Sequence, residues 1–199
     1  QSLAQSEGQL QGLIQVKGAP KSPTLTLSLN GTQLNYQDDY ALAGFTLDGT
    51  LAALGQQTSS LSLKMTDGQA PGVQLQQLDW QLAGTLANHQ SHLQIDSHQL
   101  MAAVAFSGQY QANSWQASWQ EARFKSDMGD WQLQQPMQSN WQSAQQQLSL
   151  SPSCWQDNNA RLCFTFGNTL SAAQGELQLV ASKLDLAAFS VLLEQHQSL

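Results

Sequence analysis

Charged side chains are scarce in this sequence of 199 residues. They make up 11% of it, against roughly 25% in ordinary soluble domains, and the net charge is −7. Of the seven basic residues, only Arg123 and Lys125 lie close together. The chain therefore lacks the cationic patch that binds nucleic acid or anionic headgroups, and we expect no nucleic-acid partner.

Long apolar runs are also missing, since the longest, residues 100–106, falls far short of the about 20 residues that a membrane-spanning helix needs. No secretory signal is recognisable, and the chain starts at Gln1 rather than at a methionine. We expect a fragment of a longer protein.

Catalytic motifs are absent too. The sequence has no Gly-x-Ser-x-Gly elbow, no phosphate-binding glycine loop and no His-Glu-x-x-His helix. His89 and His92 are three residues apart, so in a strand they point to opposite faces and do not share a metal. Residues 38–39 and the pair Asp127 and Asp130 fall in apparent turns, where aspartate bonds to the backbone. We expect no enzyme activity, no metal and no cofactor.

Cysteine occurs only twice, at Cys154 and Cys163. Asn158 and Asn159 between them suit the centre of a two-residue hairpin turn, because asparagine tolerates positive φ. Counting outward from that turn sets the cysteines opposite each other as a non-hydrogen-bonded pair, with Cα atoms about 4.5 Å apart. This predicts a cross-strand disulfide and an oxidising compartment. The alternative is two reduced thiols on a strand of a cytosolic protein.

The polar part of the sequence is mostly glutamine, with 34 residues, many of them alternating with leucine. Residues 24–29 alternate strictly between threonine or serine and leucine, as a strand with one apolar face does. Asn30 and Gly31 follow, and this dipeptide predicts a tight hairpin turn. Folding back there would set Leu27 opposite Leu34 on the same face.

The same period of two continues along the chain and predicts about a dozen strands. Asp67 and Gly68 read as another turn, and a phase change between Leu75 and Leu78 predicts a β-bulge. Only residues 186–195 read as a helix, a short amphipathic one capped by Asp185. We expect an all-β, mostly antiparallel fold that forms one segment over residues 1–199, with a short C-terminal helix.

A dozen one-faced strands have three ways to cover their apolar side: two packed sheets, a closed barrel, or a curled sheet whose groove receives an apolar partner. The pattern by itself leaves all three open. It also leaves open that the leucines and tryptophans are ordinary core.

Several motifs taken in order resemble one family. They are Gly84-Thr-Leu with His89 soon after, the alternating strand that ends at Gly108, Trp115 with Trp119, the Gly129-Asp-Trp-Gln-Leu run, and the Cys-Trp to Leu-Cys hairpin. Together they resemble the TamB family, the periplasmic component of the translocation and assembly module and a relative of the AsmA-like proteins. The resemblance is clearest over about residues 80–195, and it suggests an internal or C-terminal-half fragment.

The resemblance implies an elongated, taco-like β-groove that reaches across the periplasm, in a protein anchored in the inner membrane by a helix outside this chain. It implies movement of glycerophospholipids between inner and outer membranes. It also implies a TamA-like outer-membrane partner. Two alternatives remain: a β-scaffold that assists outer-membrane protein assembly with TamA, and a β-sandwich that serves only as a spacer.

Phospholipid acyl chains are thus the expected ligand, and the residues expected to line the groove share one strand face by parity. These are Leu25, Leu27, Leu34, Phe45, Leu47, Leu63, Leu82, Leu93, Val104, Phe106, Leu133, Leu150, Phe164 and Leu179.

Overall fold

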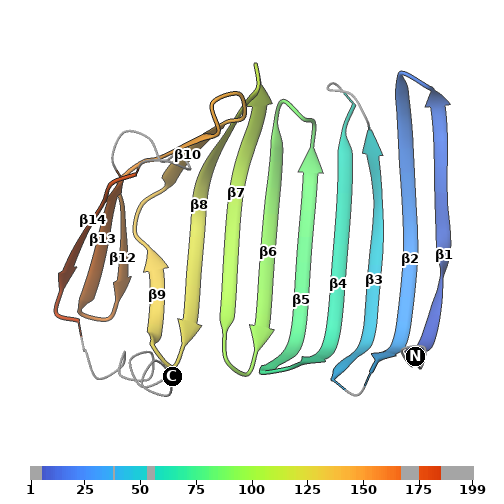
Figure 1. Cartoon of the computed structure of the whole chain (residues 1–199), viewed down its shortest axis with the longest axis horizontal. Helices are drawn as coiled ribbons and strands as arrows, with labels where there is room; N and C mark the ends of the chain where they lie inside the picture. Colours follow the sequence, from blue (N-terminus) through green and yellow to red (C-terminus); the bar gives the residue numbers. More distant parts are fainter. Residues whose placement is uncertain (1–5, 38, 53–56, 167–174, 185–199) are drawn as a thin grey trace.

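The computed structural model describes residues 6–37, 39–52, 57–166 and 175–184, and these form one open, curled, antiparallel sheet of 14 strands (Figure 1). The expected all-β fold is confirmed. The helix expected at residues 186–195 lies outside the described residues.

The strands are long at the N-terminal side and short at the C-terminal side. Their bounds are β1 Ser6–Ala19, β2 Ser22–Tyr36, β3 Tyr40–Ala52, β4 Ser59–Ala70, β5 Val73–Gly84, β6 His89–Ser97, β7 Met101–Gln111, β8 Ser114–Ser126, β9 Gly129–Leu133, β10 Met137–Gln142, β11 Gln147–Leu150, β12 Ser153–Asp157, β13 Ala160–Phe166 and β14 Leu177–Ser182.

Strands β1 to β9 form a simple meander in which each strand pairs with the next, and the sheet then divides at β8. The first half of β8 pairs with β10, through Trp115↔Trp141 for example, and β10 pairs with β11. The second half pairs with β9, through Phe124↔Trp131, and β9 leads on to β12, β13 and β14. One strand thus supports two branches of the sheet.

A β-bulge in β8 lies where the two branches part. The pairing of β7 with β8 shifts by one residue between Ala105↔Glu121 and Phe106↔Trp119. A bulge bends its strand and increases the local twist, so the two halves of β8 point their outer edges at different partners.

The prediction of a hairpin turn at Asn30 and Gly31 is wrong. Strand β2 runs straight through both residues, which pair with Thr46 and Phe45 of β3. Gly31 has another task, because a Cβ built on it would lie 2.2 Å from Cε1 of the Phe45 ring. Glycine here leaves room for an aromatic ring of the neighbouring strand, and local sequence does not distinguish this use from a turn.

The turn expected at Asp67 and Gly68 is also wrong, since β4 continues to Ala70 and the chain reverses at Pro71 and Gly72. Asp67 instead has a positive φ of 49° inside the strand. It belongs to a line of irregular residues that crosses β2 to β5.

We call this line the crease, and define it by Gln33 of β2, Ala43 of β3, Asp67 of β4 and Gln76 of β5. Each of these residues interrupts the cross-strand pairing, which resumes with the residues before and after it. Gln33 and Asp67 have positive φ, and the β5–β6 register shifts at Gln76. The phase change predicted as a bulge between Leu75 and Leu78 is therefore confirmed.

The crease keeps the apolar residues on one side of the sheet although they change parity along the sequence. Leu29 precedes it in β2 and Leu34 follows it, an odd spacing that an uninterrupted strand would place on opposite faces. Gly31 lies two residues after Leu29 and so shares its face. A Cβ on Gly31 would lie 3.0 Å from Cδ1 of Leu34, so Leu29 and Leu34 point to the same side of the sheet. The irregularity preserves the face.

Candidate functional site

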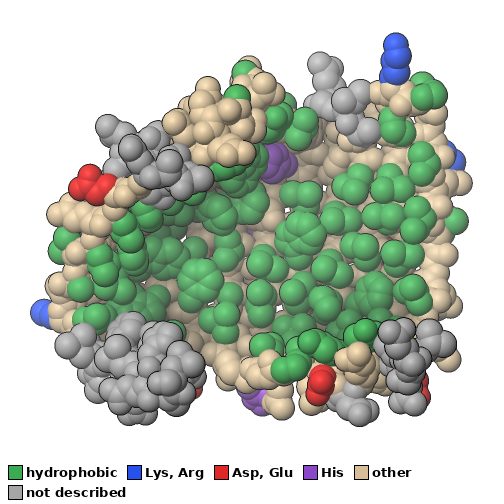
Figure 2. All heavy atoms as spheres, viewed as in Figure 1, with side chains coloured by type: hydrophobic (Ala, Val, Ile, Leu, Met, Phe, Trp, Pro, Cys, Tyr) green, Lys and Arg blue, Asp and Glu red, His purple; other side chains and the backbone are tan. Residues whose placement is uncertain are grey.

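The candidate site is the apolar face of the sheet. Cross-strand pairs connect it from strand to strand, for example Leu47↔Leu63, Leu63↔Trp80, Trp80↔Leu93 and Leu93↔Val104. Figure 2 shows hydrophobic side chains spread over nearly the whole of this face, with charged ones at its margins.

The fourteen residues named as groove lining all lie on this face. The cross-strand pairs given above account for the central strands, and the C-terminal ones follow from Leu133↔Trp155, Ser139↔Leu150 and Phe164↔Leu179. Thirteen of them are half-buried, and Leu179 on the terminal strand is 53% exposed. Their role as a lining remains a prediction.

No second layer covers the apolar face within the described part of the chain. The only buried hydrophobic residues there are four alanines, and no large side chain is fully enclosed. A β-sandwich would bury its leucines and tryptophans between two sheets. The described residues form one sheet instead, so the sandwich alternative does not fit them.

The apolar face has two differently built parts. The leucine zone, the apolar face of β1–β4, carries aliphatic side chains on most of its area, such as Leu25, Leu27, Leu47 and Leu63. The aromatic zone, the apolar face of β7–β13, carries a cluster of rings. Phe106 contacts Trp119 with ring centroids 4.8 Å apart and Trp115 at 5.8 Å.

Indole N–H groups on the apolar face are bonded within the protein. Trp80 Nε1 donates to Ser91 Oγ and Trp119 Nε1 donates to Ser139 Oγ, each at 2.9 Å. The two serines are only 3% and 5% exposed, among the most buried polar residues described.

Two more indoles are satisfied in the same way. Trp115 Nε1 donates to His89 Nε2 at 3.1 Å, and Trp131 Nε1 donates to the Met128 carbonyl at 3.0 Å. Gly108 makes room for the histidine, since a Cβ there would lie 2.3 Å from His89 Nε2. A hydrocarbon placed over these rings would leave none of the four donors without an acceptor, which avoids the cost of an unmade hydrogen bond.

Sequence reasoning did not identify these acceptors. Ser91 and Ser139 interrupt the apolar alternation and read as ordinary turn or polar residues. One signal could have identified them. It is a small polar residue that stands where the alternation calls for an apolar one, close to a tryptophan of the next strand. That signal needs the strand register, which the sequence did not supply.

The apolar face deepens into a hollow where the two branches of the sheet diverge. Met137 of β10 and Leu150 of β11 border it on one side, and Trp155 of β12 borders it on the other. Its volume is about 570 Å³, and its lining is apolar except for Ser126 and Ser153. The remaining lining residues are Leu100, Phe124, Met128, Trp131, Leu162, Phe164 and Phe166.

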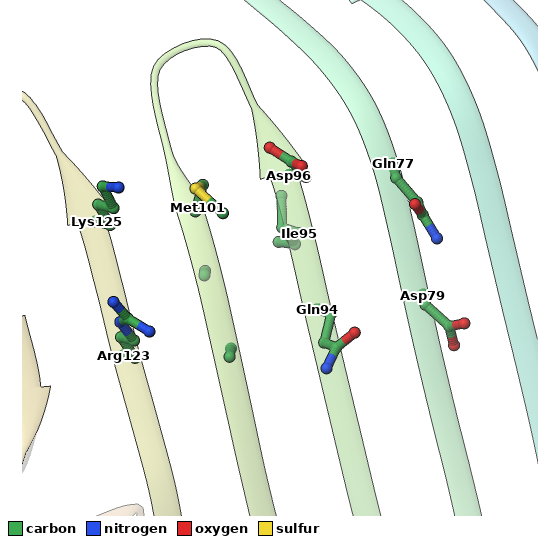
Figure 3. A pocket seen from close by; sticks show the side chains of 10 residues that line it. Gln77, Asp79, Gln94, Ile95, Asp96, Met101, Arg123 and Lys125 are labelled. Carbon is green, nitrogen blue, oxygen red and sulfur yellow. The ribbon is translucent and has the colours of Figure 1, made fainter. Parts of the chain in front are cut away.

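The opposite face of the sheet is polar and holds a smaller hollow, of about 320 Å³ (Figure 3). Asp79 and Asp96 lie on its β5–β6 side and Arg123 and Lys125 on β8. Arg123 Nε donates to Asp130 Oδ1 at 2.7 Å, and this bond lowers the pKa of the Asp130 carboxyl and raises the pKa of the Arg123 guanidinium.

Asp79 is paired as well, with Lys64 Nζ at 3.4 Å. Two of the four charges around the polar hollow are therefore paired with residues on the flanking strands β4 and β9. The expectation that Asp130 lies in a turn is wrong, since it is the second residue of β9.

The cysteine pair is where the hairpin geometry predicted it. Cys154↔Cys163 and Trp155↔Leu162 are cross-strand pairs around the Asn158 turn, and the two sulfurs are bonded at 2.13 Å with Cα atoms 4.1 Å apart. Because neighbouring residues alternate in direction, the disulfide lies on the polar face while Trp155 and Leu162 lie on the apolar one. It therefore fixes the hairpin without occupying the apolar surface.

The histidine geometry also matches the expectation. His89 pairs with Gly108 on the apolar face and His92 pairs with Ala105 on the polar face, so they cannot share a ligand. Across the described ranges, no group of three or more His, Cys, Asp or Glu side chains is placed to hold a metal ion.

Comparison with known families identifies the chain. Residues 1–199 match the family model described as the TamB N-terminal domain. The chain belongs to the TamB family. This family forms a translocation and assembly module that spans the periplasm, so the expected family and envelope location are confirmed at that level. No solved structure matches the chain.

Family membership corrects one expectation. The match is to an N-terminal domain over residues 1–199, so the placement of the chain in the C-terminal half of a TamB protein is wrong. The motifs that carried the resemblance lie mainly after residue 80, and they marked the family without marking the position within it.

In the described ranges there is no helix long and apolar enough to cross a membrane.

Proposed function

We propose that this chain is a segment of a TamB-family conduit that carries glycerophospholipids between the inner and outer membranes, with their acyl chains on the apolar face. The observation that carries the proposal is the continuous apolar face of a single-layer sheet, which no other described residue covers. An exposed apolar patch of this extent marks a binding surface in a soluble protein.

The physical basis is transfer of hydrocarbon out of water. Each methylene that moves onto the face contributes about 0.8 kcal/mol, so the two tails of a phospholipid supply the affinity without contacts to the headgroup. A lining without charge also suits movement. The leucine zone offers closely similar contacts at successive positions, and no single one holds a tail strongly.

The proposed lining is the set of fourteen residues named from the sequence. The tryptophans with bonded indole groups join them as part of the same surface. A headgroup stays in water at the open side of the groove, which agrees with the absence of a basic cluster from the face in the described residues.

The charge test places Val104→Glu in the middle of the face, where Val104 pairs with Leu93 and Ala122. Lipid that co-purifies with the chain, counted by mass spectrometry, should fall about fivefold or more, because an unpaired carboxylate at an apolar contact costs about 1–3 kcal/mol or more. Cellular phospholipid transport should fall with it.

The matched control is Ala103→Glu, one residue away on the polar face and opposite Arg123. It should fold and bind lipid as the unmodified chain does. If Val104→Glu folds and still carries as much lipid as the control, the apolar face is not the lipid path.

A second candidate function is a scaffold that pairs with strands of nascent outer-membrane proteins. The open edge at β1 favours it, since residues 9–16 carry no charge, and Leu10 and Val16 are 65% and 67% exposed. Edges in soluble proteins are usually protected by charges, prolines or bulges. Strand addition depends on backbone groups, so it predicts that Val104→Glu leaves assembly of outer-membrane proteins intact.

A further inference from the structure

We infer that the apolar hollow between the two branches of the sheet is a holding site for one phospholipid acyl chain, whereas the leucine zone is a surface along which chains move. This inference rests on the proposed function and adds a division of labour within the same face. It assigns the holding role to the residues around Trp155 and Leu162.

The first argument is shape. At about 570 Å³, the hollow falls in the range of about 300–1,000 Å³ typical of small-molecule sites. It is walled on more than one side, because the β8 bulge sends β10–β11 and β9–β12–β13 to different sides of it. The leucine zone also borders a hollow, of about 500 Å³, but that hollow lies over a continuous run of paired strands and not between two diverging branches.

The second argument is chemistry. The lining consists of aliphatic and aromatic side chains with two serines, and neither an acid nor a base is among them. Trp131 directs its indole N–H to the Met128 carbonyl, and Phe124 packs on Trp155 with ring centroids 5.5 Å apart. An occupant therefore meets hydrocarbon and ring faces, and a linear hydrocarbon chain fits that lining without losing hydrogen bonds.

The third argument is continuity. Phe124, which lines the hollow, pairs with Ala102 of β7, and Ala102 pairs with Ile95 of β6 on the same apolar face. The hollow thus opens onto the surface proposed to carry lipid. A tail that leaves the leucine zone reaches the hollow without crossing water.

Fluorine NMR on the whole chain tests this directly. Labelled with 5-fluorotryptophan, the chain should give one signal for each of its six tryptophans, assigned by single Trp→Phe variants. A phospholipid with a spin label near the end of one acyl chain is then added in steps. The Trp155 and Trp131 signals should broaden at lower lipid than the Trp80 signal, which reports on the side next to the leucine zone.

A binding measurement with the same lipid supplies the second test. Leu162→Asp should weaken binding at least about tenfold, because it places a charge inside the hollow. Leu27→Asp, at a half-buried leucine of the same lining in the leucine zone, should also weaken binding but by a smaller factor, because lipid can shift along the zone. The control is Thr165→Glu, at an exposed residue on the polar face of β13, and it should leave binding unchanged.

The outcomes separate the two levels of the proposal. Equal broadening of all the tryptophan signals, with equal losses for the two aspartate variants, overturns the holding site and leaves the conduit standing. Broadening of Trp80 alone shows that another part of the chain or a second copy fills the hollow, and it also overturns the holding site. If no tryptophan responds, the conduit itself is wrong.

Discussion

The leucine zone and the aromatic zone form one apolar face by different means. In the leucine zone the strands are 12 to 15 residues long, the side chains are mostly leucine, and glycines such as Gly31 and Gly49 leave room for the neighbouring strand's side chains. In the aromatic zone the later strands are shorter, the sheet divides, and rings pack on one another.

The difference shows two ways to stabilise a sheet that, within the described ranges, has no second layer. Long strands supply many backbone hydrogen bonds, and cross-strand leucine pairs shield one another in part. Short strands supply fewer, and the aromatic zone adds ring packing, indole hydrogen bonds and a disulfide on the polar side.

Removing the disulfide should have the largest effect, and only in the aromatic zone. The double variant Cys154→Ser with Cys163→Ser opens a short loop whose closure contributes about 3 kcal/mol in the chain-entropy model. Hydrogen exchange followed by mass spectrometry should show faster exchange in β12 and β13, with β2 and β3 unchanged.

The control for this variant is Thr26→Ser with Thr50→Ser, a cross-strand pair on the polar face of β2 and β3. It should leave exchange unchanged everywhere. Equal loss of protection in both zones after disulfide removal would mean that the sheet unfolds as one unit, and the comparison of two separately stabilised zones would fail.

Gly31→Ala probes the leucine zone and should have the next largest effect. The new methyl group meets the Phe45 ring, which must move, and overpacking of this kind costs about 1–3 kcal/mol. Urea unfolding should show the loss. Gly44→Ala is the control, because its nearest atom is Thr66 Oγ1 at 3.2 Å on the polar side.

Adding Phe45→Leu to Gly31→Ala should recover part of the lost stability, since the smaller side chain makes room for the methyl group. A Gly31→Ala variant as stable as Gly44→Ala would show that the ring moves freely, and that close packing is not what fixes the leucine zone.

The smallest effect is expected for Ser139→Ala in the aromatic zone. It removes the acceptor for Trp119 Nε1 and leaves a half-buried donor unpaired, which costs about 1 kcal/mol. Ser118→Ala on the polar face loses only an exposed bond from Gln138 and should be nearly neutral.

Trp119→Phe combined with Ser139→Ala removes both partners of the bond, so it should be more stable than the sum of the two single changes predicts. Thermal melting of the four variants gives the coupling. Additive losses would show that the indole bond contributes nothing to the aromatic zone.

Features of the fold that depend on residues close together in the sequence could be predicted, and those that depend on distant contacts could not. The Cys154 to Cys163 hairpin was predicted with its register, because a two-residue turn fixes all its pairs. The bulge near Gln76 was predicted because a change of phase in the apolar pattern requires one if the face is to stay continuous. The turn at Asn30 was predicted wrongly, since the same dipeptide also serves inside a strand under an aromatic ring.

The pattern of residues along the chain was enough to predict one-faced strands, the residues that share the apolar face, and the pairing of the two cysteines. Period-two alternation and short turns involve residues close in sequence, so they can be recognised without knowing which distant residues are in contact. Three features became known only from the folded chain: the face is left uncovered in the described residues, β8 divides the sheet, and Ser91, Ser139 and His89 accept indole hydrogens. These features depend on which strands pair and in what register, and the energy that selects among pairings comes from contacts between distant residues.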